Sequence, residues 1–354
     1  MPSVPVPFRR DRSRIRARRA RGTGAAIGLA AVAALSLGAC STAPSDPAHD
    51  GRLSVVASTN VWGSVAAAVA GDHADITSIV TGPSADPHSY EASPRDAAAL
   101  TDADLVVYNG GGYDGFLDDI LDSMRGKPTV NAYDLHDTES DLHAGHEEHG
   151  SDTGHVADVA AEGTHAGHGH DHGGANEHVW YDLPTVDTVA HRIAAELSAL
   201  DPANADAYTA NAEAFHGKLH QVADITAGIA AAHPQTAIAQ TEPIAHYLLA
   251  AADLQDRTPT DFTRAIEEGN DPPPAAIAAT RDLLSGKKVG VLVYNTQTED
   301  KVTLDIRSVA ESAGIPVVEV TETLPDGVDY VQWQTATAER LASAIDTAAG
   351  RPAA

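Results

Sequence analysis

The side chains best suited to chemistry in this sequence lie in a histidine-rich tract that runs from His143 to Pro184. Nine of the chain's eighteen histidines fall between positions 143 and 178, interspersed with Gly, Ala, Asp and Glu. They are His143, His146, His149, His155, His165, His168, His170, His172 and His178. Neutral imidazole is the commonest protein ligand for transition metals, and a segment this polar cannot bury a core of its own. The tract therefore predicts metal capture on a solvated loop, and the alternative is a linker whose histidines are incidental.

A second ligand set is expected where predicted strands end. His88 lies in a turn-rich loop after one such strand, and Glu242 and Glu322 each follow a strand in the second half of the chain. His178, at the end of the histidine tract, completes the set. Two imidazoles and two carboxylates, two from each half of the chain, suit a four-coordinate divalent ion.

Four protein ligands would close the coordination sphere of that ion, whereas a catalytic zinc keeps one position open for water. The sequence also lacks a His-Glu-x-x-His helix motif. Binding without chemistry is therefore expected, so the chain is predicted not to be an enzyme. A secreted metallohydrolase is the alternative, and turnover with metal bound would favour it.

Alternating strands and helices are expected to position these donors. In the first half, predicted strands cover 53–58, 76–80, 105–108 and 129–132, and predicted helices cover 61–70, 93–101 and 116–124. In the second half, predicted strands cover 236–240, 289–294 and 316–320, and predicted helices cover 244–254, 272–284, 302–313 and 333–348. This rhythm predicts parallel sheets with helices on their faces, whose ligands bind beyond the carboxyl ends of the strands.

Between the two sets, a helix at 186–200 is followed by nearly thirty residues of helical sequence without proline, at 203–232. We therefore predict an α/β fold of two lobes, each with a parallel sheet flanked by helices, joined by one long linker helix. The predicted segments are a lipoprotein signal peptide at 1–39, a tether at 40–52 and an N-terminal lobe at 53–200 that carries the histidine-rich loop at 143–178. A linker helix at 201–232 and a C-terminal lobe at 233–354 complete the predicted organisation.

The first forty residues predict export and anchoring. Eight arginines precede a short apolar run at 25–37, which is typical of a secretory signal and too short for a stable membrane span. The run ends in Leu37-Gly38-Ala39-Cys40, which resembles a bacterial lipobox, and Cys40 is the only cysteine. We expect a lipid on Cys40 and an extracytoplasmic, membrane-anchored bacterial lipoprotein. An unmodified cysteine is the alternative, and the Arg18-Arg19 pair leaves export by the Sec or the twin-arginine route open.

The charge balance narrows the class of partner. The chain has 50 acidic and 23 basic residues, for a formal net charge of -27 at pH 7. Such a charge repels nucleic acid and anionic membrane surfaces but concentrates cations. We therefore expect no nucleic-acid partner, membrane contact through the lipid anchor, and a monomer.

Taken together, these motifs resemble the metal-binding solute receptors of bacterial zinc and manganese ABC transporters, known as the cluster A-I family. The resemblance covers nearly all of the chain after the signal. It rests on Asp86-Pro87-His88-Ser89-Tyr90-Glu91, on the histidine-rich insertion, on His178-Val179-Trp180 with Asp182 and Pro184, and on Asp201-Pro202 with Asn204, Tyr208 and Asn211. The resemblance implies that His88 and His178 are the first and second metal ligands.

For the third family ligand, counting back five residues from Tyr247 leads to Glu242, and His246 is kept as a candidate. Glu322 is expected to replace the family's late aspartate, with Glu299, Asp300, Asp326 and Asp329 as rivals. Glu177 stands where many relatives have proline, which puts the local backbone geometry in question but not the histidine after it.

The resemblance implies a receptor that captures a divalent ion between its lobes and delivers it to a membrane permease. Imidazoles suit zinc, whereas two carboxylates favour harder ions such as manganese. Because manganese binds histidine tracts poorly, we predict zinc, with the tract as a secondary zinc trap. The alternatives are a manganese receptor of the same class, and a zinc-buffering or adhesin-type lipoprotein active in cell adhesion rather than transport.

Overall fold

The structure, a computed structural model, describes residues 52–82, 87–136 and 176–350. The predicted signal peptide, tether and Cys40, and the histidines from His143 to His172, lie outside the described residues. No helix of the described part is both long enough and apolar enough to cross a membrane.

The first lobe is built on a parallel sheet in the order β2-β1-β3-β4. Its strands are β1 (Leu53–Thr59), β2 (Ala74–Val80), β3 (Leu105–Tyr108) and β4 (Thr129–Asn131). Helices α1 (Asn60–Ala70), α2 (Pro94–Asp102) and α3 (Asp118–Ser123) lie between them. The central strands are runs of apolar residues because both faces of the sheet are covered by helices.

The second lobe repeats the arrangement in a parallel sheet with the order β6-β5-β7-β8. Its strands are β5 (Ala237–Gln240), β6 (Gln255–Asp256), β7 (Leu292–Asn295) and β8 (Val317–Val320). Its helices are α7 (His246–Ala251), α8 (Thr260–Glu267), α9 (Pro274–Ser285), α10 (Lys301–Ala313) and α11 (Tyr330–Ala348). The predicted fold class of two parallel sheets flanked by helices is confirmed.

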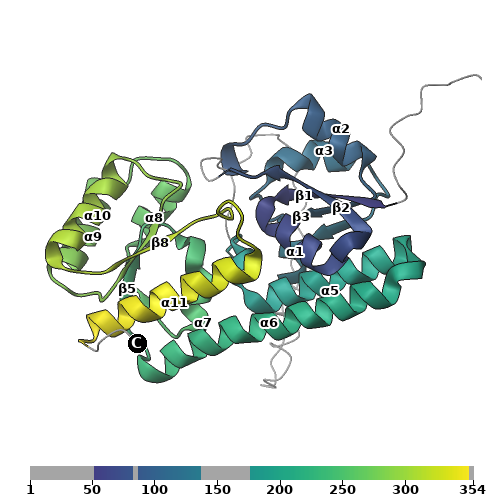
Figure 1. The fold of residues 1–354 in the computed structure, drawn as a ribbon. Helices are drawn as coiled ribbons and strands as arrows, with labels where there is room; N and C mark the ends of the chain where they lie inside the picture. The colour runs from purple at the N-terminus through teal and green to yellow at the C-terminus, as the bar shows by residue number, and fades with distance from the viewer. Residues whose placement is uncertain (1–51, 83–86, 137–175, 351–354) are drawn as a thin grey trace, which may run out of the picture. The chain divides into compact units, whose positions relative to one another are not determined.

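One long helix connects the two lobes. Helix α5 (Leu183–Leu200) runs beside α6 (Ala205–Ala232), and α6 continues from α1 and α5 of the first lobe to α7 and α11 of the second (Figure 1). Between them, Asp201 accepts hydrogen bonds from Asn204 Nδ2 at 2.6 Å and from Tyr208 Oη at 2.9 Å. Side chains from both lobes form one continuous apolar core, and α6 packs against this core along its length. The predicted linker helix is thereby confirmed as a feature of the fold, while the residue boundaries of the predicted domains stay predictions.

Most predicted elements match within a few residues, and two were missed. Strand β6 has only two residues, and α8 has eight, which is too short for a clear helical period. The predicted helix at 116–124 begins as a 3-10 turn at Gly115–Leu117 before α3. The error at α8 matters, because this helix ends in a carboxylate at the candidate site.

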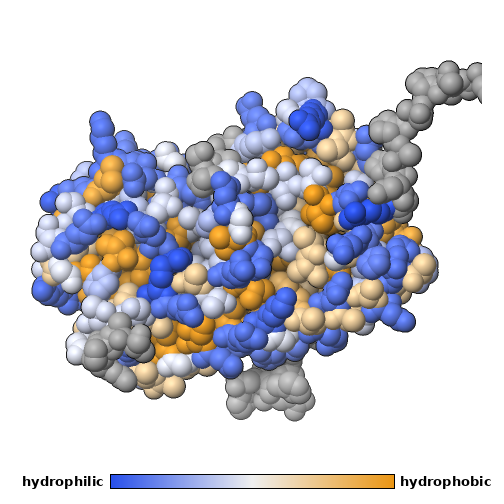
Figure 2. Space-filling model, in the orientation of Figure 1, coloured by the Kyte–Doolittle hydropathy of each residue, from blue (hydrophilic) through white to orange (hydrophobic). Residues whose placement is uncertain are grey.

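On the face shown in Figure 2, hydrophilic side chains predominate, and apolar side chains are visible along the line where α6 and α11 meet. Among the large apolar side chains that the structure describes, only Leu200 and Leu304 count as exposed. Most of the buried apolar residues fall into three clusters, which agrees with a chain long enough for sizeable cores.

Candidate metal site

Three polar side chains of the second lobe meet where its strands end. Glu242 follows β5, Asn295 ends β7 and Glu322 follows β8, so all three lie at the carboxyl edge of the sheet. The strand order reverses between β5 and β7, and such a switch point is where open parallel sheets bind ligands. Asn295 Nδ2 donates to Glu242 Oε2 at 2.5 Å and to Glu322 Oε1 at 2.9 Å. One amide therefore holds both predicted carboxylate ligands.

Local hydrogen bonds fix that amide. The backbone N–H of Gln297 donates to Asn295 Oδ1 at 3.0 Å, so the amide nitrogen must face the carboxylates. The backbone N–H of Asn295 donates to Thr241 Oγ1 at 3.0 Å, and Thr298 Oγ1 donates to Glu242 Oε2 at 2.6 Å. Glu242, Asn295 and Glu322 are 4%, 1% and 2% exposed. Buried carboxylates are costly to ionise unless hydrogen bonds or positive charge compensate them, so two of them held together in this way are suited to binding a cation.

In the first lobe, His88, Glu177 and His178 place one ligand atom each within 4.8 Å of one another. His88 lies in a 3-10 turn at Pro87–Ser89, and its Nε2 is 3.6 Å from Glu177 Oε1. His178 is buried, whereas the side chain of His88 is 28% exposed. Two imidazoles and one carboxylate at these separations fit a divalent transition metal.

The orientation of the His178 ring is set by Asn176. Nδ1 of His178 is 2.9 Å from Asn176 Oδ1, and this oxygen also accepts the backbone N–H of His178 at 2.8 Å. An amide oxygen only accepts, so Nδ1 carries the proton and the lone pair of Nε2 is left for a metal. Asn176 Nδ2 in turn donates to the carbonyl of Pro243 at 2.9 Å, next to Glu242. The second histidine is therefore held from both lobes.

Tyr113 joins the histidines to the carboxylates. Its hydroxyl donates to Glu322 Oε2 at 3.2 Å, and its ring lies 4.9 Å from the ring of His88 and 6.0 Å from that of His178. The loop that carries it follows β3 and contains Gly110 and Gly111, both with positive φ. A Cβ at Gly111 would come within 2.6 Å of the Tyr133 ring, so glycine is required there.

Two buried polar residues brace this loop. Asp114 accepts the backbone N–H groups of Asn109 at 2.7 Å and Gly110 at 2.8 Å, and burial raises the pKa of its carboxyl. Asn109 accepts from Trp62 Nε1 at 3.2 Å and donates to the carbonyl of Glu177 at 2.9 Å. The end of β3 therefore fixes the backbone of Glu177, and with it the direction of its side chain.

The pKa shifts of three buried groups at the site favour the binding of a cation. Burial and then the charge of Glu242 raise the pKa of Glu177 to about 7. Burial, followed by Glu177 and Glu242, raises the pKa of Glu267 to about 8. Burial, and then His88 and His246, lower the pKa of His178 well below its usual value. Carboxyls that resist ionisation and an imidazole that resists protonation together form a pocket of donors suited to a divalent ion.

The structure brings His88 and His178 together in the first lobe and Glu242 and Glu322 together in the second. Tyr113, which donates to Glu322, and the charge of Glu242, which raises the pKa of Glu177, connect the two pairs.

The rivals of the predicted ligands have other partners or lie on the surface. His246 is exposed at the start of α7, and Asp326 is exposed. Asp300 and Asp329 cap α10 and α11, and Glu299 accepts from Tyr294 Oη at 3.1 Å.

Four residues at the site were not predicted to act there. Glu177 adjoins a predicted ligand, and its position in place of proline was the one available signal. Glu267 ends the missed helix α8, with its Oε1 3.9 Å from His178 Nδ1. Asn295 ends a predicted strand, and Tyr113 follows three glycines, but neither residue type marks a metal site by itself.

Comparison with known families agrees with the predicted resemblance. The family model of the periplasmic zinc-uptake complex component A, ZnuA, matches residues 55–344. The manganese-binding lipoprotein MntA of Bacillus subtilis is 28% identical over 185 residues, which cover 52% of this chain and 52% of MntA. The iron ABC transporter substrate-binding lipoprotein MtsA of Streptococcus pyogenes is 27% identical over 189 residues, which cover 52% of this chain and 53% of MtsA. The chain thus spans about half the length of these relatives.

Solved structures share the fold. The periplasmic zinc-binding protein TroA of Treponema pallidum superimposes with a TM-score of 0.65 at 15% identity, covering 83% of this chain and 99% of TroA. The laminin-binding protein Lmb of Streptococcus agalactiae, described as having adhesin and metal-transporting activity, superimposes with a TM-score of 0.63 at 22% identity, covering 83% of this chain and 99% of Lmb.

Proposed function

The chain belongs to the family of the periplasmic zinc-uptake component ZnuA, and from this we propose that it captures a divalent transition metal outside the cytoplasm and delivers it to the permease of an ABC transporter. The ion is the cargo of the protein and undergoes no reaction. In this proposal His88 and His178 are ligands from the first lobe, and Glu242 and Glu322 are ligands from the second.

One observation carries the proposal. Donors from distant parts of the chain, all buried except His88, lie at strand ends and loops of the two lobes, and three of them are oriented by hydrogen bonds with Asn295, Asn176 and Tyr113. Such second-sphere groups orient ligands and are typical of sites built for metals. Glu177 joins His88 and His178 closely enough to be a fifth donor, or to replace one of the four.

Zinc is the proposed cargo, and manganese is the alternative. The two imidazoles and the histidine-rich tract favour zinc, since imidazole suits zinc better than manganese. The carboxylates favour manganese, and Glu177 adds to their number. The names of the manganese-binding relative MntA and of the iron-transporter relative MtsA do not favour zinc over manganese. We place zinc first because of the tract from His143 to His172, which we propose to be a secondary zinc trap.

Lipidation of Cys40 would place the receptor at the membrane beside its permease. Delivery is proposed to need small lobe movements, because contacts cross directly between the lobes. The side chain of Asn60 pairs with the backbone of Leu324 at 2.9 and 3.0 Å, and Tyr181 Oη donates to the carbonyl of Thr321 at 2.9 Å. With α6 packed against both lobes, a wide hinge opening would break all of these contacts.

Metal titration of single-site variants tests the ligand assignment. The metal-free protein would be titrated with zinc and with manganese in competition with a chelator, alongside His88→Ala, Glu242→Ala and Glu322→Ala. His246→Ala is the matched control, because His246 is an exposed imidazole of the same region. We expect the tight site to be lost in the first three variants and kept in the control. Tight binding in Glu242→Ala together with its loss in His246→Ala would reassign the third ligand, and unchanged binding in all four variants would refute the site.

Transport is tested separately, by metal uptake in cells. Deleting residues 145–174 should reduce zinc stoichiometry and uptake at limiting zinc while leaving the tight site intact. If both quantities stay unchanged, the tract is not a zinc trap. If the tight site binds metal but its ligand variants support normal uptake, the protein buffers metal instead of delivering it.

A further inference from the structure

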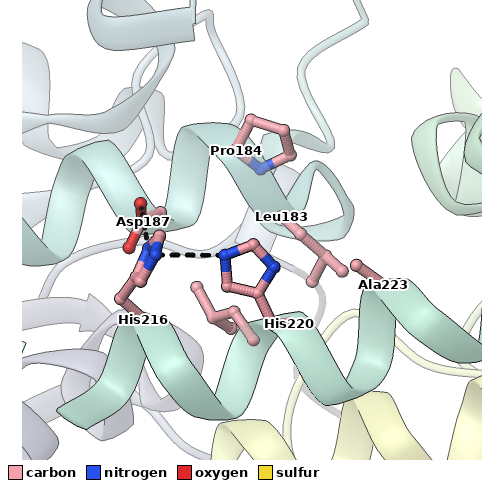
Figure 3. Close-up of a pocket in the computed structure, with 7 residues that line it drawn as sticks. Leu183, Pro184, Asp187, His216, His220 and Ala223 are labelled. Atoms are coloured by element: carbon pink, nitrogen blue, oxygen red, sulfur yellow. Dashed lines mark hydrogen bonds and ion pairs between the residues drawn. The ribbon is translucent and has the colours of Figure 1, made fainter. Parts of the chain in front are cut away.

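A second group of histidines lies on α5 and α6, in the part of the molecule that the proposed function does not use. His216 and His220 are one helical turn apart on α6, and their Nε2 atoms are 3.0 Å apart. Asp187 of α5 faces them, with its Oδ2 2.8 Å from His216 Nδ1. Figure 3 shows His216 beside Asp187 across the helix pair and His220 turned toward His216 along α6. We call these three residues the α5–α6 cluster.

The Asp187 carboxylate determines which nitrogen of His216 is free. A carboxylate only accepts, so His216 Nδ1 carries the proton and its Nε2 presents a lone pair. This is the carboxylate–histidine arrangement that raises the basicity of metal-bound imidazole. Without metal, His220 Nε2 donates its proton to His216 Nε2, and with metal His220 changes tautomer so that both Nε2 atoms can bind.

The separation of the two nitrogens is close to that of a chelate. Tetrahedral zinc with bonds of about 2.0–2.1 Å to nitrogen places two ligand atoms about 3.3 Å apart. The rings need to separate by only a few tenths of an ångström. Both rings are free to do so, because His220 is exposed and the side chain of His216 is 42% exposed. Histidines at positions i and i+4 of a helix are a recognised way to hold zinc.

The surroundings supply space and negative charge. The cluster borders a hollow of about 250 Å³, lined also by Leu183, Pro184, Leu219 and Ala223, which leaves room for water ligands (Figure 3). Oδ1 of Asp187 is buried and has no hydrogen-bond partner among the described residues. His191 adds a third imidazole on this face, 3.5 Å from Asp187 Oδ1 and 3.5 Å from Glu213 Oε1.

We propose that the α5–α6 cluster is a second divalent-metal site, in which His216 and His220 bind the ion through Nε2 and Asp187 orients His216. The expected ligand is a divalent ion that prefers imidazole ligands, such as zinc or nickel, and not magnesium or manganese. The site shares no residue with the candidate site at the strand ends. Binding there would fix His216 and His220 in place beside α5, on the helix that connects the lobes.

Nickel separates the two sites experimentally. Crystals of the full chain would first be loaded with one equivalent of zinc and then soaked in nickel chloride, and anomalous maps would be recorded at the nickel edge. The expected result is a nickel peak bonded to Nε2 of His216 and of His220. A map without a peak at this position under nickel saturation would overturn the proposal.

Equilibrium dialysis of the zinc-loaded protein against nickel gives the solution counterpart. His220→Ala should bind one nickel ion fewer than the wild type, and Asp187→Asn should weaken that ion about tenfold through loss of the orienting carboxylate. Gln221→Ala is the matched control, because it changes the adjacent exposed position of α6. Equal nickel binding in the wild type, His220→Ala and Asp187→Asn would show that the rings form only a hydrogen bond.

Discussion

Replacing Asn295 by alanine should weaken both the fold and the metal site, because its amide nitrogen is shared by two buried carboxylates. The variant loses hydrogen bonds of 2.5 Å to Glu242 and 2.9 Å to Glu322. A hydrogen bond to a charged group contributes about 1.5–3 kcal/mol. Two such bonds would give 3–6 kcal/mol, and the low end applies because water can enter the space that the side chain leaves. We expect the free energy of unfolding of the metal-free protein to fall by about 3 kcal/mol.

The same change should reduce zinc affinity by a factor of about 10–100, as is typical when a group that orients a metal ligand is removed. Urea unfolding of the metal-free protein measures the first effect, and chelator competition measures the second. Asn270→Ala is the matched control, because Asn270 is an exposed asparagine of the same lobe.

The two readouts separate two explanations. If stability falls but zinc affinity does not, the amide supports packing and the carboxylates of Glu242 and Glu322 are not ligands. If Asn295→Ala matches the control in both measurements, the buried amide does not hold the carboxylates, and these strand ends do not form a metal site.

Three further predictions concern stability. In the metal-free protein, Glu177 and Glu267 have pKa values raised from 4.5 to about 7 and about 8, so the stability that they contribute is complete below pH 4.5 and is lost as the pH rises through those values. The lowered pKa of His178 has the opposite effect on stability, but only below pH 6.5. Urea unfolding should therefore show that the free energy of unfolding falls by about 2 kcal/mol between pH 6.5 and pH 8. Equal or greater stability at pH 8 would contradict this prediction. Gly111→Ala places a Cβ on a residue with positive φ and against the Tyr133 ring. The melting temperature should fall by an amount equivalent to about 1–3 kcal/mol. An unchanged melting temperature would mean that the loop adapts. Asp300→Ala removes the capping box at the start of α10 and should cost about 1 kcal/mol in urea unfolding with no change in zinc affinity, so a large loss of affinity would restore Asp300 as a ligand candidate.

The sequence alone was sufficient for the fold class, and it also led to four candidate ligands, which stay predictions. Apolar runs mark buried parallel strands, and proline-free helical sequence from 203 to 232 marks α6, because these signals depend on local periodicity. His88, Glu242 and Glu322 could be proposed because the ends of parallel strands face a common edge, so position along the chain already implies position in space.

Tertiary structure decided how these residues meet. The roles of Asn295, Tyr113 and Glu267 depend on partners 27 to 209 residues away or on a short helix without a clear period, and no local pattern records such contacts. The pairing of His216 with Asp187 likewise exists only because α5 packs beside α6. Sequence periodicity reports which face of an element is buried, whereas the hydrogen bonds of a buried polar group depend on what packing brings beside it.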